Sequence, residues 1–331
     1  MHLDEQDPHG LQIYLSRKGW ICDNELVTSL GKPGEGNMNY TLRVRTANRS
    51  LIVKQARGYV EKYPSIPAPI ERAVMEGLFY REIAQNPELR RYMPELLGLD
   101  EAENLLVLED LGEASDFLDC YKAGQLVQPD EITALVTYLS VLHNQFLTDR
   151  PNHDFANEAM RTLNHEHIFV YPFLDNNGFD LDGIQTGLQA LALPYKKKPL
   201  ADAARELGKR YLTDQVGMPV TLLHGDYYPG SWLRTQSDVK VIDPEFCFYG
   251  PAEFDLGVML AHLHLAQQPE AVHQQVQAGY VRHAGFDEQL LRKFTGVEML
   301  RRLIGIAQLP VSLSLDEKAH LLELAESLVM G

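Results

Sequence analysis

The chain has 331 residues, enough for two packed lobes with a sizeable core. Its formal net charge of −16 argues against nucleic acid and anionic membrane surfaces as partners, because both repel an acidic protein. The three cysteines are odd in number and far apart, which excludes a disulfide framework and favours a reducing cytoplasm: Cys22, Cys120 and Cys247. The most apolar run, 256–266, is too short to span a bilayer and predicts a buried helix.

The first part of the chain predicts strands separated by turns. Residues 11–18 predict a short amphipathic helix, and residues 40–45 alternate as a strand after the glycine-rich turn 31–37. Glycine backbone N–H groups can close over bound phosphate oxygens, although an ordinary hairpin turn explains this stretch equally well by itself. Residues 50–55 predict a strand with Lys54 near its end, and a solvated strand-end lysine is the simpler interpretation of that position.

A change in composition marks a boundary between two lobes. Residues 70–84 predict a helix, and 94–99 and 105–109 predict strands. The chain then becomes polar and helical after the sequence Leu-Glu-Asp-Leu-Gly at 108–112. We therefore expect an α+β protein with an N-lobe at 1–110 and a C-lobe at 111–331. The helices expected in the C-lobe are 131–146, 200–212, 253–265, 270–284, 287–308 and 314–330.

The stretch 221–255 carries the strongest chemical signal. An apolar strand leads into His-Gly-Asp at 224–226, and a later apolar strand leads into Asp-Pro-Glu at 243–245. A hairpin of 232–235 against 239–242 would hold the two acidic loops side by side, because a hairpin brings its flanks together. One carboxylate can then orient an attacking hydroxyl while others hold magnesium on nucleotide phosphates.

These motifs resemble the protein-kinase-like small-molecule kinases, which include aminoglycoside phosphotransferases, choline kinases and methylthioribose kinases. In that group His-Gly-Asp replaces the His-Arg-Asp of protein kinases, and the later Asp stands in place of the Asp of Asp-Phe-Gly. The sequence around 241–257, VIDPEFCFYGPAEFDLG, looks most like methylthioribose kinase. The resemblance covers nearly the whole chain and implies a bilobal protein-kinase-like fold with a small antiparallel-sheet N-lobe.

The resemblance also implies roles for individual residues. Asp226 would be catalytic, and Asp243, Glu245 and Ser231 would bind Mg²⁺. Most of the wider group has Asn where Ser231 stands, whereas the methylthioribose kinase pattern also has Ser. Asp255 would brace the catalytic loop through its backbone. The residues implied in ATP binding are Gly34, Gly36 and Asn37 of the glycine turn, Lys54 with its partner Glu76, and Glu109 and Leu111 at the hinge.

Two arginines occur among apolar residues in the late helix. Arg301 and Arg302 resemble an arginine pair that reaches the substrate site in methylthioribose kinases, which implies a catalytic role. Burying arginine is costly unless it meets an anion or other acceptors, so at least one should face the cleft. The alternative is that one arginine forms a structural ion pair and the other is solvated.

The function implied is an ATP- and Mg²⁺-dependent cytoplasmic kinase that phosphorylates a hydroxyl of a small sugar-like acceptor, methylthioribose or a relative. An aminoglycoside or choline phosphotransferase is the alternative within enzymes, and a non-catalytic nucleotide-binding protein with a kinase fold is the alternative outside them. The catalytic loop reads HGDYYPGS where HGDLHTGS is expected, so Tyr227, Tyr228 and Pro229 depart from the pattern beside the acceptor. A homodimer is left open.

Overall fold

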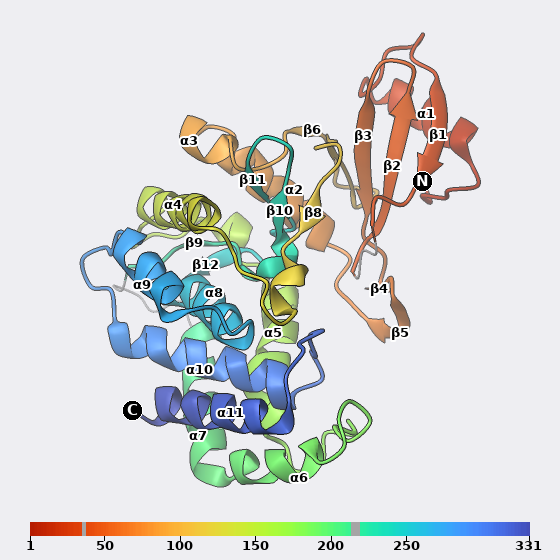
Figure 1. Cartoon of the computed structure of the whole chain (residues 1–331). Coiled ribbons are helices and arrows are strands. Elements are labelled where there is room, and N and C mark those ends of the chain that lie inside the picture. Colours follow the sequence, from red (N-terminus) through yellow and green to blue (C-terminus); the bar gives the residue numbers. More distant parts are fainter. Residues whose placement is uncertain (35–37, 213–218) are drawn as a thin grey trace. The chain divides into compact units, whose positions relative to one another are not determined.

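The computed structural model describes residues 1–34, 38–212 and 219–331 (Figure 1). The chain forms two compact units, one of Met1–Ser115 with Thr235–Phe246 and one of Asp116–Arg234 with Cys247–Gly331. The first is built on a sheet and the second is mainly helical, so the predicted α+β class is confirmed. Within the described ranges, none of the helices combines the length and the apolar character needed to cross a membrane.

The first unit contains a five-stranded antiparallel sheet with the strand order β1-β2-β3-β7-β6. Its strands are β1 (Val27–Gly31), β2 (Tyr40–Thr46), β3 (Ser50–Gln55), β6 (Leu96–Asp100) and β7 (Leu105–Glu109). The other elements of this unit are α1 (Pro8–Arg17), α2 (Arg72–Ile83), α3 (Pro87–Arg90), β4 (Tyr59–Val60), β5 (Tyr63–Pro67) and β11 (Val239–Val241).

Alternation along the strands separates an apolar face from a charged one. Leu51 and Val53 of β3 are buried in a cluster with Leu11 and Leu15 of α1. Because successive strand side chains point to opposite faces, Lys54 points away from this cluster. On the opposite face of the sheet Lys54 contacts Glu76 of α2. The alternation that buries Leu51 and Val53 on one face of β3 therefore places Lys54 on the other.

The segment Thr235–Phe246 groups with the first unit, which differs from the expected division at 110/111. The reason is a set of hydrogen bonds between residues far apart in the chain, which a local sequence pattern does not predict. The Val241 N–H donates to the Tyr92 carbonyl at 2.7 Å, and Lys240 Nζ donates to the Arg91 carbonyl at 2.5 Å. The Asp-Pro-Glu loop therefore belongs to the sheet-containing unit.

The second unit holds most of the helices. They are α4 (Pro129–Gln145), α5 (Glu158–His165), α6 (Leu188–Ala192), α7 (Lys198–Leu212), α8 (Glu253–Leu265), α9 (Glu270–Gly279), α10 (Glu288–Ile304) and α11 (Leu315–Met330). Its strands are β9 (Thr221–Leu223), β10 (Trp232–Arg234) and β12 (Phe248–Gly250), and β8 (Ser115–Asp116) lies where the chain leaves the first unit. Both strands expected for the hairpin, β10 and β11, form.

Helix α8 is the buried centre of this unit and packs against α10, which also packs against α11 (Figure 1). Gly257 permits the close approach, because a Cβ atom there would lie 2.9 Å from the Cβ of Phe294. Two expected helices end early. Helix α9 ends at Gly279 because Tyr280 takes an extended backbone, and α10 ends at Ile304 because Gly305 does the same.

Candidate functional site

The His-Gly-Asp loop is fixed by a buried carboxylate. It follows β9, and Gly225 has a φ of +86°, a left-handed conformation that favours glycine. Asp255, in the first turn of α8, accepts the N–H of His224 at 2.6 Å and the N–H of Gly225 at 3.0 Å. The bracing bonds implied for Asp255 are therefore present, and His143 Nε2 lies 3.4 Å from the same carboxylate.

Asp226 is held next to a guanidinium. Its side chain is 20% exposed, and its Oδ1 lies 3.4 Å from Arg302 Nη2. Burial raises the pKa of the Asp226 carboxyl above its ordinary value, although Arg302 and Arg301 act in the opposite direction. A carboxylate of raised pKa that still reaches solvent is suited to accept a proton from a bound hydroxyl.

The two arginines have different partners. Arg302 Nε donates to Glu298 at 2.6 Å, and its Nη2 lies at Asp226. Arg301 donates to Glu298 at 3.1 Å and to Asn164 Oδ1 at 3.2 Å. Glu298 is missing from the sequence-based site, although its position one helical turn before both arginines was a usable signal.

Ser231 also lies in the second unit. Its hydroxyl donates to the backbone carbonyl of Asp226 at 3.0 Å, and the side chain is buried. It is thus held beside the predicted catalytic residue.

Lys54 meets two acids in the first unit. Its Nζ donates to Glu76 Oε1 at 2.9 Å and forms an ion pair with Asp243. Burial acts to lower the pKa of Lys54, but Asp243 and Glu76 outweigh it and hold that pKa well above its ordinary value. The predicted Lys54–Glu76 pair is therefore present, and it keeps a positive charge at the end of β3.

Asp243 has a φ of +63°, an uncommon conformation for a residue with a side chain. It follows β11 and is separated by one proline from Glu245, which is buried. Glu245 Oε2 accepts Asn39 Nδ2 at 2.8 Å and lies 3.6 Å from Arg72 Nε. Neither partner was predicted from the sequence, because each comes from a segment far from 245.

The acids of this cluster outnumber its cations. It contains three carboxylates, those of Glu76, Asp243 and Glu245, and two cations, Lys54 and Arg72. Burial, with Glu76 next in importance, raises the pKa of Glu245 to about 8. A divalent cation would relieve this excess of acid, and carboxylate oxygens are the ligands that Mg²⁺ takes from proteins. Within the described ranges, no group of three or more His, Cys, Asp or Glu side chains is arranged to hold a metal ion. Mg²⁺ usually takes only one or two carboxylates from a protein and completes its shell with water and phosphate oxygens.

The other residues predicted to bind ATP lie in the glycine turn and at the end of β7. Gly34 is exposed, whereas Gly36 and Asn37 lie outside the described residues. Glu109 ends β7, and its N–H donates to the Glu95 carbonyl at 2.9 Å. That N–H is therefore used within the protein. Leu111 follows β7 and is partly exposed.

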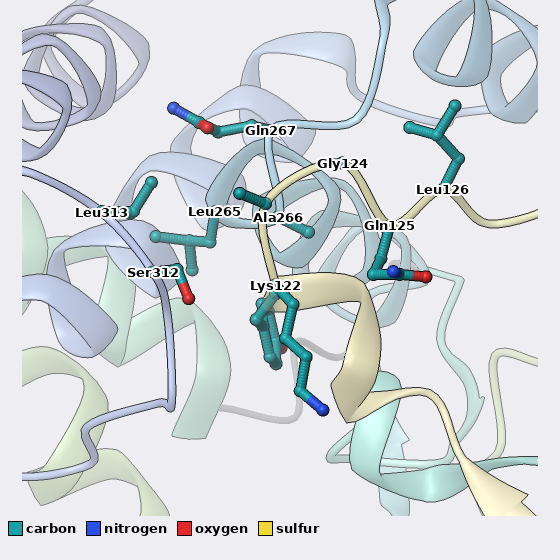
Figure 2. Close-up of a pocket in the computed structure, with 11 residues that line it drawn as sticks. Lys122, Gly124, Gln125, Leu126, Leu265, Ala266, Gln267, Ser312 and Leu313 are labelled. Carbon is teal, nitrogen blue, oxygen red and sulfur yellow. The ribbon is translucent and has the colours of Figure 1, made fainter.

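A small cavity of about 110 Å³ lies in the second unit, and Figure 2 draws the residues that line it. The loop from Tyr121 to Leu126, the end of α8 at Leu265 and the pair Ser312–Leu313 line it. None of the predicted site residues is among its lining residues.

Comparison with known proteins identifies relatives over most of the chain. The model of the phosphotransferase enzyme family, APH, matches residues 30–292. The methylthioribose kinase of Exiguobacterium sibiricum is 28% identical over 268 residues, which cover 76% of this chain and 64% of that protein. The methylthioribose kinase of Geobacillus kaustophilus is 28% identical over 324 residues, which cover 83% of this chain and 78% of that protein.

A solved structure is similar in fold. The choline kinase of Cryptosporidium parvum Iowa II has a TM-score of 0.53 and is 13% identical, with 97% of this chain and 92% of that chain covered. The protein-kinase-like fold predicted from the motifs is therefore confirmed.

Proposed function

This chain belongs to the phosphotransferase enzyme family, and on that premise we propose that it transfers the γ-phosphate of ATP, with Mg²⁺, to a hydroxyl of a small sugar-like acceptor. Methylthioribose or a close relative is the acceptor we favour, because the curated relatives are methylthioribose kinases. We place the reaction in the cytoplasm, in keeping with three cysteines that form no disulfide.

The observation that carries the proposal is the pairing of Asp226 with Arg302 in a loop braced by Asp255. In the proposed mechanism Asp226 orients the acceptor hydroxyl and accepts its proton. The hydroxyl oxygen attacks the γ-phosphorus in line, the bond from that phosphorus to the β-phosphate oxygen breaks, and ADP leaves. The Arg302 guanidinium stabilises negative charge that develops near the transferring group.

The first unit supplies the groups for the nucleotide. Lys54 neutralises phosphate charge, and Asp243 and Glu245 would hold Mg²⁺ through carboxylate oxygens. Ser231 of the second unit is proposed as a further oxygen donor to the ion. The ion supplies charge neutralisation on the phosphate oxygens when bound. Gly34, Gly36, Asn37, Glu109 and Leu111 remain proposed nucleotide contacts.

Asp243→Ala is expected to weaken binding of ATP with magnesium by on the order of tenfold or more, because it removes a ligand oxygen. Binding of metal-free ATP should be equal or slightly stronger, because the substitution releases Lys54 from its ion pair. Calorimetry with magnesium and with EDTA measures both. Asp238→Ala, at an exposed acid in the preceding turn, is the control and should change neither. Equal weakening with and without magnesium would contradict the metal role.

The acceptor preference follows from the charge at Asp226. A guanidinium there offers donors to sugar hydroxyls and to the developing phosphate charge, and it repels an ammonium group. Choline and polycationic aminoglycosides are therefore disfavoured as acceptors. Tyr228 lies beside the same guanidinium, with 5.2 Å between the guanidinium carbon of Arg302 and the centroid of the tyrosine ring.

A panel of four acceptors tests this preference in an assay coupled to ADP formation. Methylthioribose, ribose, choline and kanamycin are compared with the wild type and with Arg301→Ala and Arg302→Ala. We expect methylthioribose or ribose to be the best acceptor, and Arg302→Ala to lower kcat/KM by roughly 10²–10³-fold, as loss of a charge-stabilising donor does. Arg301→Ala should cost less, because Arg301 donates to Asn164 instead of Asp226. Efficient turnover of choline or kanamycin would overturn the assignment.

A further inference from the structure

Glu298 lies buried between the two arginines of α10. Only 1% of its side chain is exposed. One of its oxygens, Oε1, accepts Arg302 Nε at 2.6 Å, and the other, Oε2, accepts Arg301 Nη1 at 3.1 Å. Burial acts to raise the pKa of Glu298, but the arginines outweigh it and hold that pKa well below its ordinary value. Glu298 is therefore a permanent anion inside the helical unit.

A neutral histidine supports this anion from behind. His262 Nε2 lies 3.1 Å from Glu298 Oε1, and its Nδ1 faces the Tyr121 hydroxyl. Burial lowers the pKa of His262 to about 4, so the ring is neutral near pH 7. The tautomer that fits both contacts donates Nε2–H to Glu298 and accepts the Tyr121 O–H at Nδ1. His262 is therefore a third partner of Glu298 that adds no charge.

The bonds of Glu298 give the arginines separate directions. Arg302 is held at Nε by Glu298, and its Nη2 lies 3.4 Å from Asp226 Oδ1. Arg301 is held by the same carboxylate but turns its other nitrogen to Asn164. A guanidinium is planar and rigid, so fixing Nε also fixes the direction of Nη2. Glu298 itself makes no contact with Asp226 among the hydrogen bonds and ion pairs of the described residues.

We propose that Glu298 is a positioning residue for phosphoryl transfer, which holds the Arg302 guanidinium against Asp226 and acts on the reaction chiefly through Arg302. This role rests on the proposed function. It differs from a structural ion pair in one respect: removing Glu298 lowers the transfer rate much more while Arg302 is present than in its absence. Arg301 and Arg302 are both buried. If Glu298 had a structural role alone, its removal would lower the stability of the protein whether or not Arg302 is present.

A double-mutant cycle separates the two roles. Wild type, Glu298→Gln, Arg302→Met and the double variant are compared by their rates of ADP formation with ATP, magnesium and methylthioribose. We expect Glu298→Gln to lower kcat by at least roughly tenfold in the wild-type background and by less than about threefold in the Arg302→Met background, since coupled contacts are non-additive. Equal losses in both backgrounds would overturn the proposal. If Glu298→Gln does not fold, Glu298→Asp retains the charge but shortens the reach, and the same non-additivity is expected.

The control variant is Thr295→Ala on the same helix. Thr295 is buried, and its hydroxyl donates to the Leu291 carbonyl of α10 at 2.9 Å. It therefore tests the effect of disturbing α10 without touching the arginines. Its Tm should fall while kcat stays within about twofold of wild type, the range of an independent site. A loss of kcat in Thr295→Ala equal to that in Glu298→Gln would indicate a packing effect and overturn the proposal.

Two further measurements keep this test separate from the choice of acceptor. If methylthioribose is not phosphorylated, the proposed acceptor is wrong, and the same cycle is measured on the slow formation of ADP with water as acceptor. If ATP is not hydrolysed either, isotope-labelled arginine reports the site directly by NMR. The Arg302 Nε–H signal, identified by its loss in Arg302→Met, should exchange with solvent at least roughly tenfold faster in Glu298→Gln because its buried acceptor is weakened. Unchanged exchange would show that Glu298 does not hold Arg302.

Discussion

Asp226→Asn is expected to lower kcat by roughly 10²–10⁴-fold, the range for loss of a positioned general base. The amide has nearly the same size and still accepts from Arg302, but it cannot accept a proton from the acceptor hydroxyl. Because Asp226 retains partial solvent exposure and its carboxylate accepts no backbone N–H within the described part of the chain, the fold should tolerate the change. Binding of ATP should also be close to that of wild type.

Three measurements on one preparation test this expectation. Turnover gives kcat, calorimetry gives the Kd for ATP, and thermal unfolding gives Tm. Asp149→Asn, at an exposed acid of the same unit, controls for the loss of one negative charge and should leave all three near wild-type values. Turnover of the Asp226→Asn variant within about tenfold of wild type, well short of the general-base range, would move the catalytic role to another residue.

Asp255→Ala is expected to lower the free energy of unfolding by roughly 2–5 kcal/mol, because two buried backbone N–H groups lose their acceptor. These are the N–H groups of His224 and Gly225, bonded at 2.6 and 3.0 Å. His143 loses a partner as well. The same change should lower kcat by about tenfold or more, since small displacements of reacting groups are costly and Asp226 directly follows the released segment.

Chemical denaturation measures the free energy of unfolding, and turnover at a temperature well below the transition measures the effect on rate. Glu253→Gln is a matched control, because Glu253 lies in the same helical turn and accepts a backbone N–H, that of Asp287 at 2.7 Å, far from the catalytic loop in sequence. It should lower stability and leave kcat almost unchanged. Unaltered turnover in folded Asp255→Ala would show that the loop keeps its geometry without the brace.

The existence of most elements was predictable, because local patterns carry that information. Strand β3 has the predicted bounds, and α8 does as well. Helix α11 begins at Leu315 after Ser314, whose side chain and that of Glu317 form a reciprocal cap visible in the sequence. The ends of α9 and α10 were not predicted, because both depend on single residues that leave the helical conformation while the apolar pattern continues.

The sequence by itself determined which residue types stand in the acidic loops and at the end of β3. His-Gly-Asp and Asp-Pro-Glu are short contiguous motifs, and the alternation of β3 already turned Lys54 away from the valine face. Only the tertiary structure decided which charged side chains form ion pairs and hydrogen bonds with one another. Glu298 binds Arg302 and Arg301, and Arg302 also reaches Asp226. Glu245 is bound by Arg72 and Asn39. The physical reason is that the energy of a buried charge depends on its nearest partners, and here those partners come from segments distant in the chain.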